Sequence, residues 1–209
     1  MTDHSMAYSA SVRRLLDLFG KLPGVGSRSA ERMVFHILKG STDEAMALAD
    51  AIRAVKEHVR HCRVCYHLTE VDPCEICRNP SRDAGVICVV EQSKDLFQIE
   101  ATGTYRGVYH VLLGHLAALD GITPENLTID ALVKRVNERD AAGNSLVREV
   151  IIATNPTMDG DGTALYIQNL LEASGVNITR LARGLPAGAQ IEQANKAILA
   201  DALAGRVKM

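Results

Sequence analysis

The sequence predicts an α+β protein of several modules: a helical N-terminal region, a small cysteine-rich module, an α/β domain with a mainly parallel sheet, and a helical C-terminal tail. Apolar residues recur at helical spacing near the N-terminus, and two pairs of cysteines follow. After Gly85, short apolar runs alternate with helical segments. These observations place the modules at residues 1–60, 61–80, 81–182 and 183–209.

The composition is that of an ordinary soluble protein, with 47% hydrophobic and 23% charged residues. The net charge of -2 argues against a strongly basic protein that coats DNA. Residues 1–80 hold 11 Lys/Arg against 10 Asp/Glu, and residues 81–209 hold 12 against 15. Any contact with nucleic acid must therefore come from a local patch or from an oligomer.

The N-terminal residues Met1–Ala7 lack the basic stretch and apolar run of a secretory signal. No segment approaches the roughly 18 consecutive apolar residues that span a bilayer. We therefore expect a cytoplasmic protein without membrane association. In that compartment thiols stay reduced, and clustered cysteines more often bind metal than form disulfides.

Three helices are predicted before the cysteines. Gly20 ends the first helix and Gly40 ends the second, while Ser41 and Glu44 can form a capping box for the third. We expect the third helix to bury one apolar face, formed by Leu48, Ile52, Val55 and Val59.

The turn between the first two helices, Lys21-Leu22-Pro23-Gly24-Val25-Gly26-Ser27-Arg28, is a candidate phosphate clamp. Gly24 and Gly26 allow positive φ and close approach of the backbone to another molecule. The second helix begins here with unpaired N–H groups and the positive end of its dipole. Lys21 and Arg28 add charge beside it. An ordinary connection between two helices remains the alternative.

Four cysteines, Cys62, Cys65, Cys74 and Cys77, form two Cys-x2-Cys pairs. Four thiolates complete a closed tetrahedral zinc site with no position for water, so the spacing predicts one structural zinc. Zinc binding could order a segment that is too short for a core of its own. A disulfide or unrelated free thiols are the alternatives. Cys88 lies in an apolar run, and we expect it to be a buried core residue with no further role.

The α/β domain is predicted from four strand segments: the fully apolar run Val86–Val90, followed by Val108–Leu113, Val150–Ala153 and Val176–Leu181. Helical segments lie between some of them, near 94–101, 129–138 and 163–173. Glu91 follows the first run, and Asp159-Gly160-Asp161 follows the third. Parallel sheets gather functional groups at the carboxyl ends of their strands. Glu91, Asp159 and Asp161 could therefore share Mg²⁺, although Asp-Gly-Asp is also common in simple turns.

These motifs carry a resemblance to known families. The hairpin resembles the helix-hairpin-helix of DNA repair proteins, and the acidic residues resemble the Toprim domain of topoisomerases, primases and certain nucleases. The surrounding residues, in family order from about residue 10 to 204, resemble the RecR family of bacterial recombination mediators. They include Leu22-Pro23-Gly24-Val25-Gly26, Val89-Val90-Glu91 and Ala153-Thr154-Asn155-Pro156-Thr157.

The resemblance implies binding of single- and double-stranded DNA without sequence specificity, with basic residues at Lys21 and Arg28. It also implies action with RecO and RecF to load RecA on single-stranded DNA at gaps, a ring-like tetramer, and no catalysis. Two positions depart from the family. Asp159-Gly160-Asp161 replaces the usual Glu-Gly-Glu, and Gln193 and Asn195 replace the usual Tyr and Asp near the C-terminus.

Two other function classes remain open. A Mg²⁺-dependent Toprim nuclease or strand-passing enzyme would need a metal together with a nucleophile or positioned water. A zinc-containing adaptor would bind proteins without touching DNA. Cleavage of DNA identifies the first class, and absence of DNA binding identifies the second.

Overall fold

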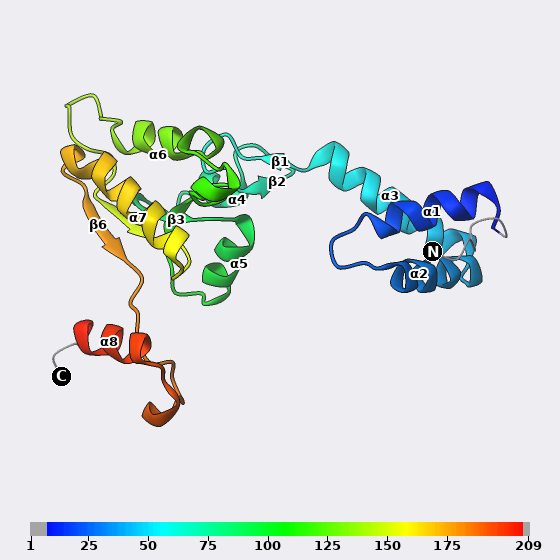
Figure 1. The fold of residues 1–209 in the computed structure, drawn as a ribbon. Coiled ribbons are helices and arrows are strands. Elements are labelled where there is room, and N and C mark those ends of the chain that lie inside the picture. Colours follow the sequence, from blue (N-terminus) through cyan, green and yellow to red (C-terminus); the bar gives the residue numbers. More distant parts are fainter. Residues whose placement is uncertain (1–7, 207–209) are drawn as a thin grey trace. The chain divides into compact units, whose positions relative to one another are not determined.

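The computed structural model of the chain describes residues 8–206. The first seven residues, where no secretory signal is expected, and the last three lie outside this range. The chain forms two compact units, Met1–Val59 and Arg60–Met209 (Figure 1). Within residues 8–206, no helix is both long and apolar enough to cross a membrane.

The first unit contains α1 (Ala10–Gly20), α2 (Ser27–Lys39) and α3 (Thr42–His58). Ser41 and Glu44 form the predicted capping box at the start of α3. Helices α1 and α2 pack together, and Ala30 and Val34 of α2 are buried. The expectation that α3 buries its apolar face is wrong within this chain, because α3 has no buried residue. Among residues 8–206, no element covers that face.

The second unit opens with the cysteine-rich module. It consists of an antiparallel pair, β1 (Arg60–His61) and β2 (Leu68–Thr69), followed by α4 (Glu75–Arg78). Backbone bonds attach the module to the domain that follows. Val111 N–H donates to the carbonyl of Cys65 at 2.8 Å, and Leu68 N–H donates to Ser93 Oγ at 3.2 Å. The module therefore packs on the neighbouring sheet.

The α/β domain is built on one four-stranded sheet in the order β4-β3-β5-β6, with every neighbouring pair parallel. The parallel sheet predicted from the sequence is thus confirmed. Its strands are β3 (Asp83–Val90), β4 (Gly107–Val111), β5 (Glu149–Ile152) and β6 (Asn177–Arg180). The connecting helices are α5 (Ser93–Ala101), α6 (Ile129–Val136) and α7 (Met158–Leu171), and the C-terminal tail carries α8 (Lys196–Ala204).

Helices cover both faces of this sheet, which explains the unbroken apolar run in β3. Ile87 and Val89 belong to a core formed with α6 and α7. Cys88 and Val90 belong to a separate core that includes Leu96 of α5. Alternate residues of a strand point to opposite faces, so a strand covered on both faces must be apolar throughout.

Helix α7 begins earlier than the sequence predicts. The expected start near residue 163 is wrong, because the helix begins at Met158. Thr157 supplies the N-cap: its hydroxyl accepts from Gly160 N–H at 3.1 Å. A Thr side chain at this position satisfies an otherwise unpaired amide, which offsets the low helix propensity of Asp-Gly-Asp. Asp159 and Asp161 therefore lie in the first turn of a helix.

Candidate zinc, nucleic-acid and acidic sites

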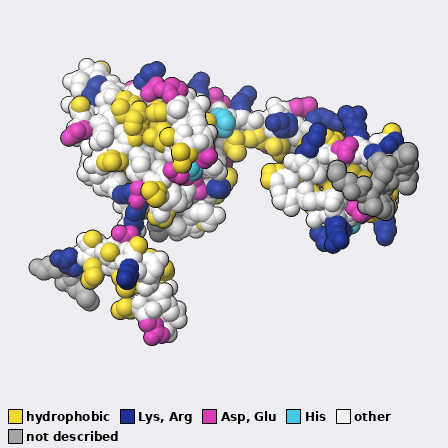
Figure 2. All heavy atoms as spheres, in the orientation of Figure 1, with side chains coloured by type: hydrophobic (Ala, Val, Ile, Leu, Met, Phe, Trp, Pro, Cys, Tyr) yellow, Lys and Arg dark blue, Asp and Glu magenta, His cyan; other side chains and the backbone are white. Residues whose placement is uncertain are grey.

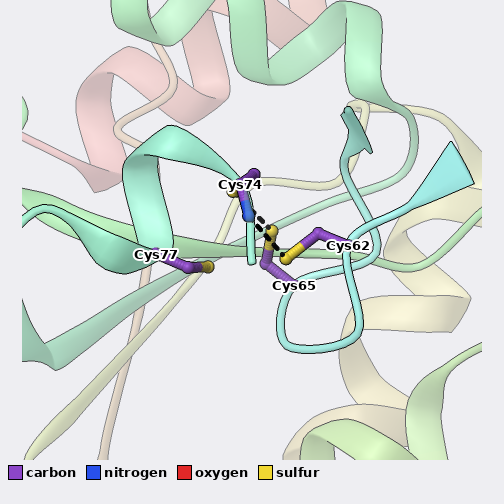
Figure 3. A group of neighbouring side chains, drawn as sticks. All are labelled: Cys62, Cys65, Cys74 and Cys77. Atoms are coloured by element: carbon purple, nitrogen blue, oxygen red, sulfur yellow. Dashed lines mark hydrogen bonds between the residues drawn. The ribbon is translucent and has the colours of Figure 1, made fainter. Parts of the chain in front are cut away.

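The four cysteine side chains converge on one point. Their sulfur atoms all lie within 4.8 Å of one another, and those of Cys65 and Cys74 are 3.5 Å apart. Figure 3 shows Cys77, on α4, directing its sulfur toward the group formed by the other three. All four thiols are free. The 3.5 Å between the sulfurs of Cys65 and Cys74 far exceeds a disulfide bond of about 2.05 Å.

This geometry fits a zinc ion. Four thiolates bound tetrahedrally at about 2.3 Å place their sulfurs about 3.8 Å apart, close to the separations in the module. Three of the four cysteines are buried, which closes the site to water. The backbone supports it, because Cys74 N–H donates to Cys62 Sγ at 3.3 Å. The donor set and its closure fit one structural zinc.

The fifth cysteine plays no part in this group. Cys88 lies in β3 at 2% exposure, and burial raises the pKa of its thiol to about 12. A protonated thiol is a poor metal ligand and a poor nucleophile. The expectation that Cys88 is only a buried core residue agrees with its place in the sheet.

The predicted phosphate clamp lies at the turn between α1 and α2. Gly24 has a φ of 76°, in the left-handed region that favours glycine, whereas Gly26 is extended at a φ of -84°. Gly26 is the N-cap of α2 and makes no side-chain cap hydrogen bond. The first amides of α2 therefore keep donors for another molecule. A Cβ at either glycine would meet open space, so the backbone is accessible.

Positive charge surrounds this turn. Lys21 and Arg28 are both exposed, as the clamp requires. Residues 8–41 hold six Lys/Arg and two Asp/Glu, a local net charge of +4 in a chain of net charge -2. Figure 2 shows several Lys and Arg side chains on this unit. The sequence interpretation missed Arg32, which is exposed four residues after Arg28 and so lies on the same face of α2.

Glu91 lies at the carboxyl end of β3, buried at 4% exposure. It accepts three hydrogen bonds: from Asn155 N–H at 2.8 Å, from Asn155 Nδ2 at 2.7 Å, and from His115 Nδ1 at 3.1 Å. His115 follows β4, and Asn155 follows β5. Three strand ends thus contribute to one group at the predicted edge. His115 and Asn155 were missed, although the strand-end rule applied to every strand points to them.

The central glycine of the Asp-Gly-Asp motif, Gly160, lies against Glu91. A Cβ at Gly160 would lie 3.0 Å from Glu91 Oε1 and 2.1 Å from the carbonyl oxygen of Asn155. Only glycine fits between those two oxygens. Gly160 of the motif and Glu91 are therefore neighbours at one edge of the sheet.

The two aspartates have different surroundings. Asp159 is exposed, while Asp161 accepts hydrogen bonds from Arg180 and Arg183. Arg183 chiefly, and Arg180 with it, holds the pKa of Asp161 below its usual range. Across residues 8–206, the cysteines are the one group of His, Cys, Asp and Glu side chains gathered as a metal site. Glu91, Asp159 and Asp161 do not gather around a single point.

Models of known protein families match the helical hairpin, the cysteine-rich module and the α/β domain. A model of the RecR helix-hairpin-helix matches residues 12–56, and a model of the RecR four-cysteine zinc finger domain matches residues 59–79. A Toprim domain model matches residues 85–182. Recombination protein RecR of Rhodopirellula baltica is 54% identical over 202 residues, which is 97% of this chain and 98% of that protein. The chain belongs to the RecR family.

Other RecR proteins are similar along the same length. Recombination protein RecR of Koribacter versatilis is 47% identical to this chain, and the match covers 95% of this chain and 97% of that protein. That of Rubrobacter xylanophilus is 48% identical over the same shares. The zinc finger model covers all four clustered cysteines, so the cofactor of this RecR chain is one structural zinc.

Proposed function

We propose that this chain is a DNA-binding mediator of recombinational repair, acting with RecO and RecF to load RecA onto single-stranded DNA at gaps. The proposal rests on relatives named Recombination protein RecR that match it along nearly its whole length. One structural observation supports direct DNA contact: a helix N-terminus that has no side-chain cap hydrogen bond lies beside a glycine turn, within a region of net charge +4. In this proposal the modules span residues 1–60, 61–80, 81–182 and 183–209.

The proposed DNA contacts are Lys21 and Arg28 with the backbone at Gly24 and Gly26. Such groups bind phosphates rather than bases, so affinity should not depend on sequence. Each phosphate neutralised adds about -0.9 to the slope of log K against log salt on duplex DNA, and about -0.7 on single strands. Binding to both kinds of DNA should therefore be strongly sensitive to salt.

Fluorescence anisotropy across salt concentrations tests this. Lys21→Ala with Arg28→Ala should weaken binding to every sequence alike and flatten the salt slope. Arg53→Ala with Lys56→Ala is the matched control, because it removes two exposed positive charges from α3. A folded hairpin variant with wild-type affinity and slope would exclude the clamp, and absence of DNA binding by the wild type would favour the adaptor.

The proposed role is not enzymatic. A Toprim nuclease would need carboxylates arranged around Mg²⁺. Here two arginines already bind Asp161, and Glu91 accepts bonds from Asn155 and His115. Incubation of labelled DNA with Mg²⁺ should give no cleavage. Cleavage that disappears in Asp159→Asn would instead establish the enzyme.

We also propose that the chain assembles into a homo-oligomer, as a ring-like tetramer. Leu48, Ile52 and Val55 are exposed along one face of α3, and Ile52 is 58% accessible. An apolar stripe of this kind is typical of a protein interface. Several hairpins in one assembly would give useful DNA affinity to a chain of net charge -2.

A further inference from the structure

Asp161, in the first turn of α7, is bound by two arginines from a segment about 20 residues further along the chain. Arg180, the last residue of β6, donates from Nη2 to Asp161 Oδ1 at 2.5 Å. Arg183 donates from Nη1 to Oδ2 at 3.1 Å and from Nη2 to Oδ1. Both carboxylate oxygens therefore have guanidinium donors, in the forked arrangement that favours strong pairing.

Arg183 also lies beside the C-terminal helix. Its carbonyl oxygen is 3.5 Å from where a Cβ at Gly205 would lie. A Cβ at Gly184 would be 3.6 Å from the Cα of Ala202, in the last turn of α8. The backbone at residues 183–184 thus packs on the end of α8 while the Arg183 side chain reaches α7.

We infer that Asp161 is a positioning residue that anchors the C-terminal segment 183–206 through Arg183 and Arg180, rather than a ligand for a divalent cation. Mg²⁺ binds through carboxylate oxygens and water. At Asp161 it would have to displace two guanidinium groups and bring two like charges close to itself. The neighbouring Asp159 forms no ion pair with any residue in the described range, so the two aspartates of the motif have separate roles.

The anchored segment carries apolar side chains that the chain itself leaves exposed. Ile191 is 68% accessible and Leu203 is 67% accessible, and α8 has no buried residue. Because Arg183 is held by Asp161, the segment that follows it can adopt fewer orientations relative to the α/β domain. Asp161 thereby controls how the segment is presented, independently of DNA binding by the hairpin.

Limited trypsin digestion of the full chain tests the anchor directly, because Arg180 and Arg183 are themselves trypsin sites. In Asp161→Asn, cleavage after Arg183 should be about ten-fold faster than in the wild type, since cleavage follows the population of the released segment. Asp159→Asn is the matched control, because it removes the same charge two residues away. Asp161→Glu restores a carboxylate and should return cleavage toward the wild-type rate.

Hydrogen exchange gives a second readout that does not depend on recognition of arginine by trypsin. Amides in residues 184–206 should exchange faster in Asp161→Asn, with unchanged exchange in β3 and β5. Unchanged cleavage and exchange in Asp161→Asn, or equal acceleration in Asp159→Asn, would overturn the inference. Millimolar MgCl₂ should leave wild-type cleavage unchanged; acceleration that depends on Asp161 would show that a cation competes for this carboxylate and would also overturn it.

Discussion

His110 lies in β4 with its ring fully buried. Its Nε2 bonds to the carbonyl oxygen and hydroxyl of Thr128, both at 3.0 Å, while Nδ1 has no partner in the described part of the chain. Burial chiefly, with the positive charge of Arg135, lowers the pKa of His110 to about 4. The folded protein therefore holds this histidine neutral at pH 7.

This burial predicts a dependence of stability on pH. Because the folded pKa is below the unfolded value of about 6.5, the unfolded state binds more protons between pH 6.5 and 4. Neutral His110 therefore contributes up to about 3 kcal/mol to the free energy of unfolding. This contribution is fully present above pH 6.5 and is lost as the pH falls toward 4. Denaturant unfolding of the zinc-loaded protein at pH 7 and pH 5 measures it.

His110→Gln is the control, because its side-chain amide can reach Thr128 and does not titrate. The difference in unfolding free energy between wild type and this variant should narrow or reverse from pH 7 to pH 5. This comparison removes the effect of cysteine protonation, which is common to both proteins. Parallel pH dependence in the two would contradict a titrating His110.

Some individual site residues could be predicted from the sequence, and others could not. Cysteine spacing predicts its own site, because the four ligands lie within one short segment. Glu91 could be predicted as a site residue because it directly follows an apolar strand. The pairing of Asp161 with Arg183 could not be predicted, since it depends on β6 lying next to β5 in the sheet. Gly160 gives no signal until the oxygens of Glu91 and Asn155 are placed around it.

Among the elements, the zinc module depends most on a bound ion. It has two-residue strands and a four-residue helix, and its buried cluster is formed by the cysteines themselves. It also covers part of the α/β domain through Cys65 and Leu68. Zinc binding in such segments contributes about 10–16 kcal/mol in apparent free energy. Loss of zinc should therefore affect both the module and its neighbour.

We predict that Cys65→Ser abolishes stoichiometric zinc and lowers Tm, whereas Cys88→Ala keeps one zinc per chain with a smaller loss of stability. Metal analysis and thermal unfolding measure the two effects. Cys88 is the matched control because it is also a buried cysteine but lies outside the cluster. Full zinc content in Cys65→Ser, or none in the wild type, would contradict the site.

The sequence predicted the elements unevenly, for physical reasons. The central strand β3 was found because burial on both faces requires uninterrupted apolar residues. The start of α7 was placed five residues late, because Asp-Gly-Asp has low helix propensity and the Thr157 cap outweighs it. The apolar pattern of α3 correctly predicts a helix, yet it does not say which molecule covers the apolar face.

For the whole molecule, that exposed face of α3 matters most. A chain with net charge -2 carries a basic hairpin, and its DNA affinity should depend on how many hairpins one assembly presents. If α3 forms a subunit contact, placing charge on its apolar face should separate subunits, because a buried unpaired carboxylate is strongly unfavourable.

We predict that Ile52→Glu with Val55→Glu lowers the molar mass measured by light scattering and leaves zinc content unchanged. Ala54→Glu is the matched control: at 100° per residue it lies about 160° around the helix from Ile52, so it adds charge to the opposite face. The dissociated variant should also bind DNA with a weaker dependence on salt, because fewer hairpins engage one DNA molecule. If n subunits bind together, the slope should fall toward one nth of the wild-type value. Wild-type mass and slope in the folded variant would show that the subunit contact, and the ring built from it, lies elsewhere.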